Sequence, residues 1–381
     1  MSGENYLKKL LNGADVKWTA LGAVADIGTG SSNRQDGSEN GIYPFFVRSK
    51  NILKSDTFEF DETAIVIPGE GGIGDIYHYV EGKYSLHQRA YRIRVAANVV
   101  NAKYLYYLMS SSFKQYILMK SVGATAISIR KPMLEDFQIP IPCPENPKKS
   151  LEIQGEIVRI LDAFTELATE LSTELTARKK QYNHYRDQLL SFEDDEVQWT
   201  ALGALAENLD SMRKPITSGL REPGDIPYYG ASGIVDYVKD YIFDCDLLLV
   251  SEDGANLLAR NTPIAFSISG KSWVNNHAHV LKFKTYAERK YVEYYLNSID
   301  LMPYISGSAQ PKLNKKSLES IRIPNPSPED KKRIVEILDK FDALTGSISD
   351  GLPREIELRQ KQYEHYRDLL LSFSKSEALG A

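Results

Sequence analysis

Residues 181–192 read QYNHYRDQLLSF, and residues 362–373 repeat them as QYEHYRDLLLSF. A second repeat lies upstream, where IVRILDAF at 157–164 returns as IVEILDKF at 334–341. Repeats this far apart indicate a duplicated domain rather than a short solenoid module. The chain is therefore predicted to hold two tandem copies of one unit, each a globular part followed by a long helix.

The first copy of the repeated stretch, residues 151–192, is predicted to form one helix. Apolar and aromatic residues recur at steps of mostly three and four. The stretch contains no proline, and Gly155 is its only helix-breaking residue. This spacing places one apolar stripe along a helix and is typical of a coiled coil. The step from Leu171 to Leu175 is four residues where three is due, which is a stutter. The residues predicted to pair the helices are Phe164, Leu167, Leu171, Leu175, Tyr182, Tyr185, Phe341, Leu344, Ile348, Tyr363 and Tyr366.

The composition is that of an ordinary globular protein, with 381 residues, 42% hydrophobic and 25% charged. This length suits two domains with helical connectors. No stretch approaches roughly 18 consecutive apolar residues, and the first residues lack a secretory pattern, so we expect no membrane span and no export. The only cysteines, Cys143 and Cys245, favour a reducing cytoplasm and argue against structural zinc. The net charge of −5 does not support nucleic-acid binding, but local clusters of positive charge could still provide it.

Matching runs open the two globular parts, VKWTALGA at 16–23 and VQWTALGA at 197–204. Each part then mixes short β-rich runs with turns, one helix and a closing Pro-rich run, so the predicted class is α+β. The predicted segments are a first globular domain at 1–147 with a short N-terminal helix, a long helix at 148–195, a second globular domain at 196–327 and a distal helix at 328–381.

The ends of the two long helices carry start and stop signals. Ser150 is the predicted N-cap of the first, while Ser327, followed by a proline, is the predicted N-cap of the second. Glycine and proline residues within the distal helix predict a kink near 350–353. The shorter helices of the globular parts are expected at 102–119 and 290–298.

Two helices with matching apolar stripes can bury those stripes on each other. Because a globular domain lies between them in the chain, we expect them to run antiparallel as a coiled coil that separates and joins the two domains. The C-terminal repeat ends where the next copy would begin, so the N-terminal helix could supply the missing connection. The predicted molecule is quasi-cyclic and has pseudo-twofold symmetry.

The repeated helices and their flanks carry a family resemblance. The chain resembles HsdS, the specificity (S) subunit of bacterial type I restriction-modification systems, and its helices are closest to the IC group. The resemblance rests on the IPIP closure at 139–142, the helix starts quoted above, the runs ARKKQY at 177–182 and LRQKQYEHYRD at 358–368, and the two-copy layout. It covers the whole chain in architecture and is specific in the helices.

The resemblance implies a function for each part. Each globular part would be a target recognition domain that reads one half of a split double-stranded DNA site. The helices would set the distance between half-sites and bind two modification (M) subunits, which in turn bind restriction (R) subunits. S-adenosylmethionine, ATP and Mg²⁺ would belong to those partners, and this chain would bind no cofactor. The runs TELA, TELS and TELT at 165–176 are similar to the family's spacer repeat, and each adds about 6 Å of helix.

Two patterns in the sequence resemble a dinucleotide site and a metal site. GEGGIG at 69–74 matches G-x-G-x-x-G, but a strand and turn follow it where a dinucleotide site needs a helix, so a hairpin or DNA-facing loop is preferred. His277 and His279 could form a metal pair, but a polar strand face or a DNA contact is preferred because no neighbouring ligand joins them in the sequence. Methyltransferase, P-loop and nuclease motifs are absent from the sequence, so no catalytic or metal-binding residue is predicted.

Two loops carry the predicted DNA contacts. They lie at 120–131 and 306–316, where Lys and Arg alternate with Gly, Ser, Thr, Gln and Asn. Cations neutralise phosphates, glycine lets backbone approach them, and amide or guanidinium groups pair with base edges. A solvated basic loop is the alternative. The predicted residues are Lys120, Thr125, Ser128, Arg130 and Lys131 in the first loop and Ser308, Gln310, Lys312, Asn314 and Lys315 in the second.

Weaker DNA-binding candidates are scattered through both domains, and each alone is no better than a surface polar residue. They are Arg34, Arg48, Lys50, Asn51, Tyr77, His87, Gln88 and Arg89 in the first domain, and Arg213, Lys214, Tyr228, Tyr229, Lys271, Trp273, Asn275 and Asn276 in the second. Two other functions remain open: a coiled-coil adaptor with two protein-binding domains, and an enzyme with an unrecognised site.

Overall fold

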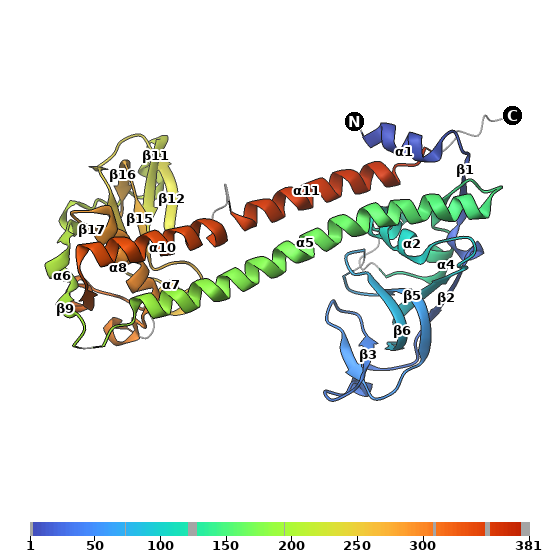
Figure 1. Cartoon of the computed structure of the whole chain (residues 1–381), viewed down its shortest axis with the longest axis horizontal. Coiled ribbons are helices and arrows are strands. Elements are labelled where there is room, and N and C mark those ends of the chain that lie inside the picture. The colour runs from blue at the N-terminus through green and yellow to red at the C-terminus, as the bar shows by residue number, and fades with distance from the viewer. Residues whose placement is uncertain are drawn as a thin grey trace. The chain divides into compact units, whose positions relative to one another are not determined.

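The computed structural model describes residues 3–72, 74–120, 128–193, 195–307, 310–346 and 351–374, with side chains from Leu7 onward. The chain forms two compact units. Unit 1 comprises Met1–Leu171 and Ile356–Ala381, and unit 2 comprises Ser172–Glu355. Each unit therefore contains one globular domain, part of the long helix and part of the distal helical segment (Figure 1).

The globular part of unit 1 is built around one sheet. Its strand order is β2-β7-β5-β6-β3-β4, and a separate two-stranded ladder pairs β1 with β8. The elements are α1 (Gly3–Leu11), β1 (Val16–Ala20), η1 (Leu21–Ala23), β2 (Ala25–Thr29), η2 (Arg34–Asp36), β3 (Tyr43–Phe46), β4 (Leu53–Ser55), β5 (Phe60–Pro68), β6 (His78–Leu86), β7 (Ala90–Val95), α2 (Ala102–Leu108), the π-helical turn η3 (Met109–Phe113), α3 (Lys114–Lys120), α4 (Lys131–Glu135) and β8 (Gln138–Pro142).

Strand β5 shows why the apolar run at 64–67 becomes the middle of this sheet. Ile65 and Ile67 belong to the core cluster that includes α2 and the start of the long helix, whereas Ala64 and Val66 belong to a second cluster. Successive side chains of a strand point to opposite faces. A continuous apolar run therefore fits a strand that is covered on both faces, as β5 is.

Unit 2 repeats this plan with different outer strands. Its elements are β9 (Gln198–Ala201), α6 (Leu202–Leu205), β10 (Glu207–Asn208), η4 (Asp210–Met212), η5 (Ser218–Leu220), β11 (Pro223–Gly230), β12 (Gly233–Val238), β13 (Phe243–Asp244), β14 (Leu247–Ser251), α7 (Asn256–Ala259), β15 (Ala265–Ile268), β16 (Lys271–Val274), β17 (Ala278–Lys282), α8 (Tyr286–Ser298), η6 (Met302–Tyr304), α9 (Lys315–Ser320) and β18 (Arg322–Asn325).

The duplication is visible in the sheet order. The order β10-β17-β14-β15 in unit 2 corresponds to β2-β7-β5-β6 in unit 1, and the ladder β18-β9 corresponds to β1-β8. The ladders pair the first and last strands of each domain, with Val16 opposite Pro142 and Gln198 opposite Asn325. The domains differ beyond this shared part, because unit 2 has a separate sheet of order β12-β11-β16-β13.

The long helix α5 runs from Pro147 to Leu190. It begins earlier than predicted. The Asn146 side chain accepts a hydrogen bond from the Lys149 backbone N–H, so Asn146 takes the capping role that was predicted for Ser150. Ser150 lies inside the helix and its hydroxyl accepts a hydrogen bond from Gln154. Pro147 suits the first helical position because it has no N–H to satisfy. Helix α8 also starts earlier than predicted, because the Thr285 hydroxyl caps it at Glu288.

The distal segment consists of α10 (Pro328–Gly346) and α11 (Leu352–Leu371). The Ser327 hydroxyl accepts a hydrogen bond from the Asp330 N–H, as predicted for an N-cap. The predicted pairing residue Ile348 and the start of the predicted kink at Asp350 lie outside the described residues. No helix within the described ranges is long and apolar enough to cross a membrane.

Both units pack their share of α5 against the distal segment. In unit 1, Phe164 stacks on Tyr366, and Leu370 shares a core with the start of α5. In unit 2, the ring of Phe341 contacts Tyr182 and Tyr185. Among the other predicted pairing residues, Leu167, Leu171, Leu175 and Tyr363 are half-buried. The prediction that Leu344 pairs the helices is wrong, because Leu344 is 39% exposed and Thr345 is buried in its place. The buried stripe continues from Phe341 with a step of four residues rather than three.

Candidate nucleic-acid interface

In the second domain, the predicted DNA-contacting loop is closed by its own backbone. Ser306 and Lys312 exchange two backbone hydrogen bonds of 2.9 and 2.8 Å. Gly307 has a φ of +83°, and a side chain there would lie 2.5 Å from the Gln310 carbonyl oxygen, so this tight turn requires glycine. We refer to the described residues 306–307 and 310–314 as the 306–314 loop. Gln310 and Lys312 are exposed, whereas Ser308 lies outside the described residues.

The 306–314 loop leads directly into helix α9. Asn314 is half-buried and caps this helix by accepting a hydrogen bond from the Ser317 N–H. Lys315, the first residue of α9, is exposed. The Asn314 side chain is thereby committed to the helix start, and Gln310, Lys312 and Lys315 are the predicted residues whose side chains reach solvent.

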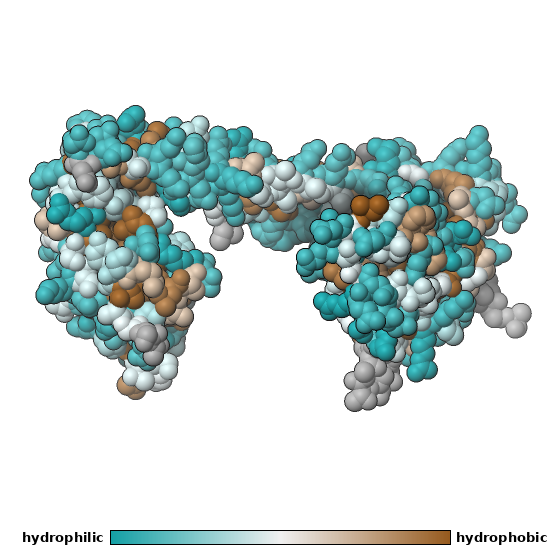
Figure 2. Space-filling view, turned by 90° about the horizontal axis from the view of Figure 1, so that it is seen from below, coloured by the Kyte–Doolittle hydropathy of each residue, from teal (hydrophilic) through white to brown (hydrophobic). Residues whose placement is uncertain are grey.

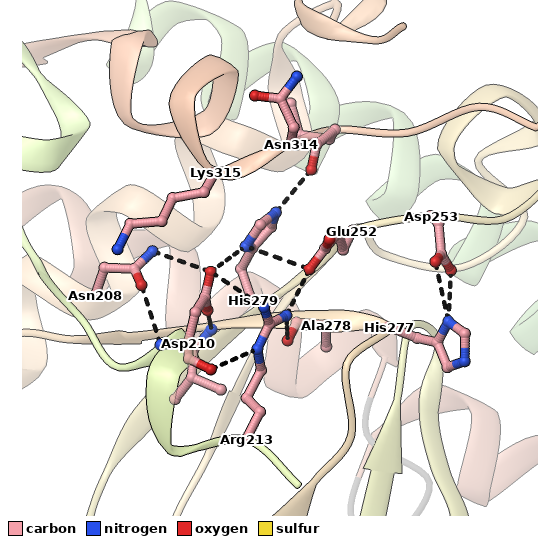
Figure 3. A network of polar contacts seen from close by, with 12 residues as sticks. Asn208, Asp210, Arg213, Glu252, Asp253, His277, Ala278, His279, Asn314 and Lys315 are labelled. Carbon is pink, nitrogen blue, oxygen red and sulfur yellow. Dashed lines mark hydrogen bonds and ion pairs between the residues drawn. The ribbon is translucent and has the colours of Figure 1, made fainter. Parts of the chain in front are cut away.

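A buried polar network lies beneath this loop (Figure 3). His279 of β17 is 1% exposed in its side chain, and its ring nitrogens lie 2.6 Å from Asp210 Oδ2 and 2.7 Å from the Leu313 carbonyl oxygen. Arg213 contributes a bond of 2.5 Å to Glu252 and one of 2.8 Å to the Ala278 carbonyl oxygen. The sequence positions are far apart, so the sheet and η4 bring these groups together.

The carboxylates of the network are held in their charged form. Burial raises the pKa of Asp210, but the hydrogen bond and charge of His279 and the Val280 N–H outweigh it, so the pKa is lowered overall. Burial likewise raises the pKa of Glu252, but hydrogen bonds from Arg213 and Lys312 outweigh burial, so the pKa is lowered overall. Buried charges are tolerated when they are paired and hydrogen-bonded in this way.

The network is poorly suited to a metal ion, although Asp210, Glu252 and His279 place three ligand atoms within 4.8 Å of one another. Both nitrogens of His279 already face oxygen atoms. The Arg213 guanidinium lies against Glu252 and repels a cation. Within the described ranges this is the one such cluster. The carboxylates beside His279 come from segments that are distant in the sequence, so the local pattern around the two histidines does not reveal them.

His277 differs from its neighbour His279. It is exposed, and its Nδ1 lies 2.9 Å from Asp253 Oδ1. His277, Asp253 and Gln310 line one surface hollow together with Gly254 and Pro311. The two histidines therefore do not form a metal pair, since one faces this hollow and the other is enclosed.

In the first domain, the corresponding segment is attached to the sheet in the same way. The Ile129 N–H donates to the Gly69 carbonyl oxygen at 2.8 Å, just as Leu313 does to Glu252. Ser128 bridges to Glu70, and the bridge between Lys312 and Asp253 is its counterpart. The predicted residues Lys120, Arg130 and Lys131 are exposed, and Ser128 is half-buried. Thr125 lies outside the described residues, as do residues 121–127 in general.

Several weaker candidates of the first domain gather beside that segment. The Glu70 carboxylate accepts hydrogen bonds from Arg48 at 3.1 Å and Arg89 at 3.2 Å. Arg34, Arg48 and His87 line one hollow together with Glu70. His87 is buried, and its burial together with the charges of Arg48 and Arg89 lowers its pKa. The His87 ring is therefore neutral beside these arginines.

The remaining candidates of the first domain do not join this group through any bond found among the described residues. Gln88 donates to the Asn33 side chain, and Lys50 and Asn51 are exposed on the loop before β4. The described residues of the glycine-rich run, 69–72 and 74, lie between β5 and β6, and β6 rather than a helix is the next element described. This arrangement agrees with a loop and does not support a dinucleotide site.

Some predicted residues of the second domain are structural. Tyr228 is 1% exposed and its hydroxyl accepts a hydrogen bond from Ile216, while Asn275 is buried and accepts one from His277. Arg213 is committed to the buried network. The prediction that these side chains face DNA is corrected by their burial. Sequence patterns cannot separate a surface tyrosine from a core tyrosine, because both occur in strands.

Other predicted residues of the second domain reach the surface. Lys214, Lys271 and Asn276 are exposed, and Tyr229 is half-buried against Phe266. Trp273 donates from its indole to the Lys214 carbonyl oxygen at 2.6 Å. Most of the face shown in Figure 2 is hydrophilic, with smaller hydrophobic patches on both globular domains.

Sequence reasoning missed Asp210 and Glu252, which organise the second domain's site. Glu252 follows the buried strand β14 directly, at the edge where the 306–314 loop is attached. A charged pair after an apolar run, Glu252-Asp253, was the available signal. Asp210 gave no comparable signal, because its role depends on the pairing of β10 with β17.

Comparison with known proteins identifies relatives of both halves. The family model described as "Type I restriction modification DNA specificity domain" matches residues 14–178 and again residues 195–358. The chain is 33% identical over 420 residues to the "Type I restriction enzyme EcoR124I/EcoR124II specificity subunit" of Escherichia coli, with 100% of both chains covered. It is 32% identical to the EcoprrI specificity subunit of the same species, covering 92% of this chain and 93% of the relative.

Solved structures show a similar fold. The type I restriction-modification S subunit from M. genitalium superposes with a TM-score of 0.65 at 16% identity, covering 96% of this chain and 98% of that chain. A chain from a study of complex assembly and conformational transition of the type I R-M system superposes with a TM-score of 0.58 at 13% identity, covering 93% and 97%. At these identities the likeness concerns the fold.

Proposed function

We propose that this chain, which belongs to the family of type I restriction-modification DNA specificity subunits, reads a bipartite, asymmetric DNA site with one half-site for each globular domain. The observation that carries this proposal is the repeated attachment of an exposed basic segment to the residues that follow the equivalent interior strands, β5 and β14. Ile129 and Leu313 make the equivalent backbone bond in the two domains. The side chains that follow differ, as two domains with different target sequences require.

The long helices are proposed to set the distance between the half-sites. Helix α5 has 44 residues, which corresponds to about 66 Å at 1.5 Å per residue. We propose that it pairs with α10 and α11 as an antiparallel coiled coil, and the aromatic contacts in each unit support this pairing. Within unit 1, Leu7 of α1 shares a core with Phe373. This shared core supports our proposal of a quasi-cyclic, pseudo-twofold molecule in which α1 completes the second connection.

We further propose that the helices bind two M subunits and, through them, R subunits. In this proposal the partners bring S-adenosylmethionine, ATP and Mg²⁺, and methyl transfer and DNA cleavage take place on them. This chain would contribute sequence recognition and position, without a catalytic group of its own. The relatives named as specificity subunits of type I restriction enzymes support this division.

The test is genome-wide mapping of methyladenine in cells that express the chain together with its cognate M subunit. Cells that express the M subunit alone are the control. We expect a split motif, with two short defined blocks around a fixed undefined gap, only when both proteins are present. Methylation without a split motif, or none despite an isolated complex, would contradict the proposal and favour an adaptor without DNA specificity.

A further inference from the structure

The buried ring of His279 has an acceptor atom at both of its nitrogens. Nδ1 lies 2.6 Å from Asp210 Oδ2, and Nε2 lies 2.7 Å from the Leu313 carbonyl oxygen. A neutral imidazole has one donor and one acceptor nitrogen, whereas an imidazolium has two donors. A neutral ring would therefore press a lone pair against an oxygen atom at one of these contacts, and the imidazolium satisfies both.

Asp210 cannot remove this conflict by carrying the proton itself. Its Oδ1 accepts a hydrogen bond of 2.8 Å from the Val280 N–H, and its pKa is lowered overall despite burial. Its Oδ2 faces Arg213 at 3.5 Å as well as His279. The carboxylate is thus held ionised by donors on several sides, and the proton belongs on the ring.

The charges around the ring come from every element packed against it. Asp210 belongs to η4 and Arg213 follows it directly. Glu252, the residue after β14, lies 3.8 Å from Nδ1, and Lys312 of the 306–314 loop is 3.1 Å from Glu252. Lys315 of α9 lies nearby (Figure 3). The exposed pair of His277 and Asp253 lies outside the enclosed group. The two carboxylates next to the ring offset its positive charge.

His279 bonds directly to the loop predicted to face DNA. Both backbone polar groups of Leu313 are hydrogen-bonded. Its N–H donates to the Glu252 carbonyl oxygen at 2.8 Å, and its C=O accepts from His279. Lys312 and Asn314 flank this residue, and Gln310 lies within the same closed turn. Loss of the His279 bond would release one of the two bonds that fix the position of Leu313.

We propose that His279, as an imidazolium, is the positioning residue of the 306–314 loop, holding it against β14 and β17 in the geometry that reads DNA. This inference rests on the proposed function of the loop. Because the two contacts together require both ring protons, a deprotonated ring loses one of them, and recognition by the second domain then weakens. A charge-assisted hydrogen bond of this kind corresponds to roughly a tenfold change in affinity.

The first domain supplies an internal comparison. Arg92 of β7 lies opposite Val66, as His279 of β17 lies opposite Val250. Arg92 pairs with Asp26 at 2.7 Å and Glu62 at 3.2 Å. Its guanidinium stays charged at every accessible pH. The pH dependence is therefore confined to one half-site, and the half-site read by the first domain should show none from this position.

The functional test uses the full chain in complex with its M subunit. DNA binding is measured between about pH 6 and pH 9, the range around imidazole titration, on the intact site and on sites with single base changes in either half. We expect discrimination in one half-site to fall roughly tenfold with rising pH, while the other half-site does not change. Site-specific binding with equal pH dependence in both halves, or none in either, would overturn the role of His279.

Two variants separate His279 from its neighbour. His279→Gln cannot donate to both oxygen atoms, so it should weaken the affected half-site at low pH, match the wild type at high pH and abolish the pH dependence. His277→Gln removes the exposed imidazole and should retain the dependence. The reverse pattern would assign the effect to His277. A complex without any split-site recognition would instead contradict the proposed function itself.

A spectroscopic measurement on the wild-type chain tests the protonation of the ring directly. With ¹⁵N-labelled histidine, the two ring nitrogens of His279 should both show the protonated signature under the conditions in which the complex reads DNA. The chain has six histidines, and loss of one signal set in His279→Gln assigns the resonance. A neutral His279 tautomer under conditions where the complex reads DNA would overturn the inference.

Discussion

The ring of Phe164 stacks on the ring of Tyr366, with centroids 5.2 Å apart and planes 19° from parallel. The repeat-equivalent residues make the same contact in the other unit. There, Phe341 stacks on Tyr185 with centroids 5.6 Å apart and planes at 28°. In one unit α5 supplies the phenylalanine, and in the other it supplies the tyrosine. The duplicated sequences thus form the same Phe–Tyr contact in both units, and the helix that supplies each ring is exchanged between the units.

Replacing either phenylalanine should loosen one unit at a time. Phe164→Ala removes a half-buried ring and its stacking contact with Tyr366, which we expect to lower the local free energy of unfolding by about 2 kcal/mol. Hydrogen exchange should then accelerate in the parts of α5 and α11 that belong to unit 1. Phe341→Ala is the matched control and should accelerate exchange in unit 2. Equal acceleration in both units from either variant would contradict independent contacts.

Lengthening α5 should change the DNA spacer and nothing else. Inserting Thr-Glu-Leu-Ala after Ala168 adds about 6 Å of helix. The hydroxyls of Thr165 and Thr169 bond to carbonyls four residues earlier, so an added threonine finds the same partner. Methylation mapping should show both half-sites unchanged around a longer gap. A changed base within either half-site, or an unchanged gap, would refute the role of the helix.

Removing a phosphate contact should weaken binding to every sequence. Lys131→Ala should lower the affinity of the complex for specific and nonspecific DNA alike, and it should reduce the slope of log affinity against log salt by about 1. Lys17→Ala, which removes an exposed lysine of β1, is the control and should leave the slope unchanged. An effect of Lys131→Ala on one base position alone would assign it to base reading instead.

Gln310→Ala should relax specificity in one half-site. Gln310 is exposed on the 306–314 loop, and an amide side chain can pair with a base edge, a contact of about 1–3 kcal/mol in discrimination. Methylation mapping should then tolerate additional bases at one position, while the other half-site remains strict. If the recognised motif is identical to that of the wild type, Gln310 does not contact a base.

Acid should destabilise unit 2 through its buried carboxylates. The pKa values of Asp210 and Glu252 are lowered in the folded protein, so their contribution to stability is present above the unfolded value of about 4. That contribution is lost as the pH falls through the lowered folded values. Asp210→Asn should reduce the free energy of unfolding by about 3 kcal/mol at neutral pH, and the stability of this variant should vary less in acid.

Denaturant titrations at several pH values check this prediction. The fluorescence of Trp199 and Trp273 reports on unit 2 when Trp18 is replaced by phenylalanine. Asp236→Asn is the control within the same unit, because the Asp236 side chain is 42% exposed and its pair with Arg221 is screened by solvent. An equal loss of stability in the two variants would show that burial of Asp210 is not the cause.

The parts of the fold that sequence predicted well are those with a repeated or periodic signal. The helix α5 follows from its apolar stripe, and the central strands β5 and β14 follow from continuous apolar runs. The boundaries were less certain. Asn146 and Ser150 are both good caps, and only the packing of the first turn shows that Asn146 is used.

The site was predicted only in part, because its contacts join segments that are distant in the chain. The loop containing Gln310 and Lys312 has a local signature of glycine and cations, which sequence reveals. The burial of Tyr228 and the enclosure of His279 depend on the arrangement of strands. A histidine two residues from another histidine suggests metal binding until the Leu313 carbonyl oxygen is found at its second nitrogen.

The ladders β1-β8 and β18-β9 join the first and last strands of each globular domain. The chain therefore enters and leaves a domain through neighbouring strands, which lie about 5 Å apart. Residues can be gained or lost between these two strands, as the different outer strands of the two domains show, without changing where the chain enters and leaves the domain. Each domain can thus change its size and surface during evolution without altering the geometry of the helices to which it is attached.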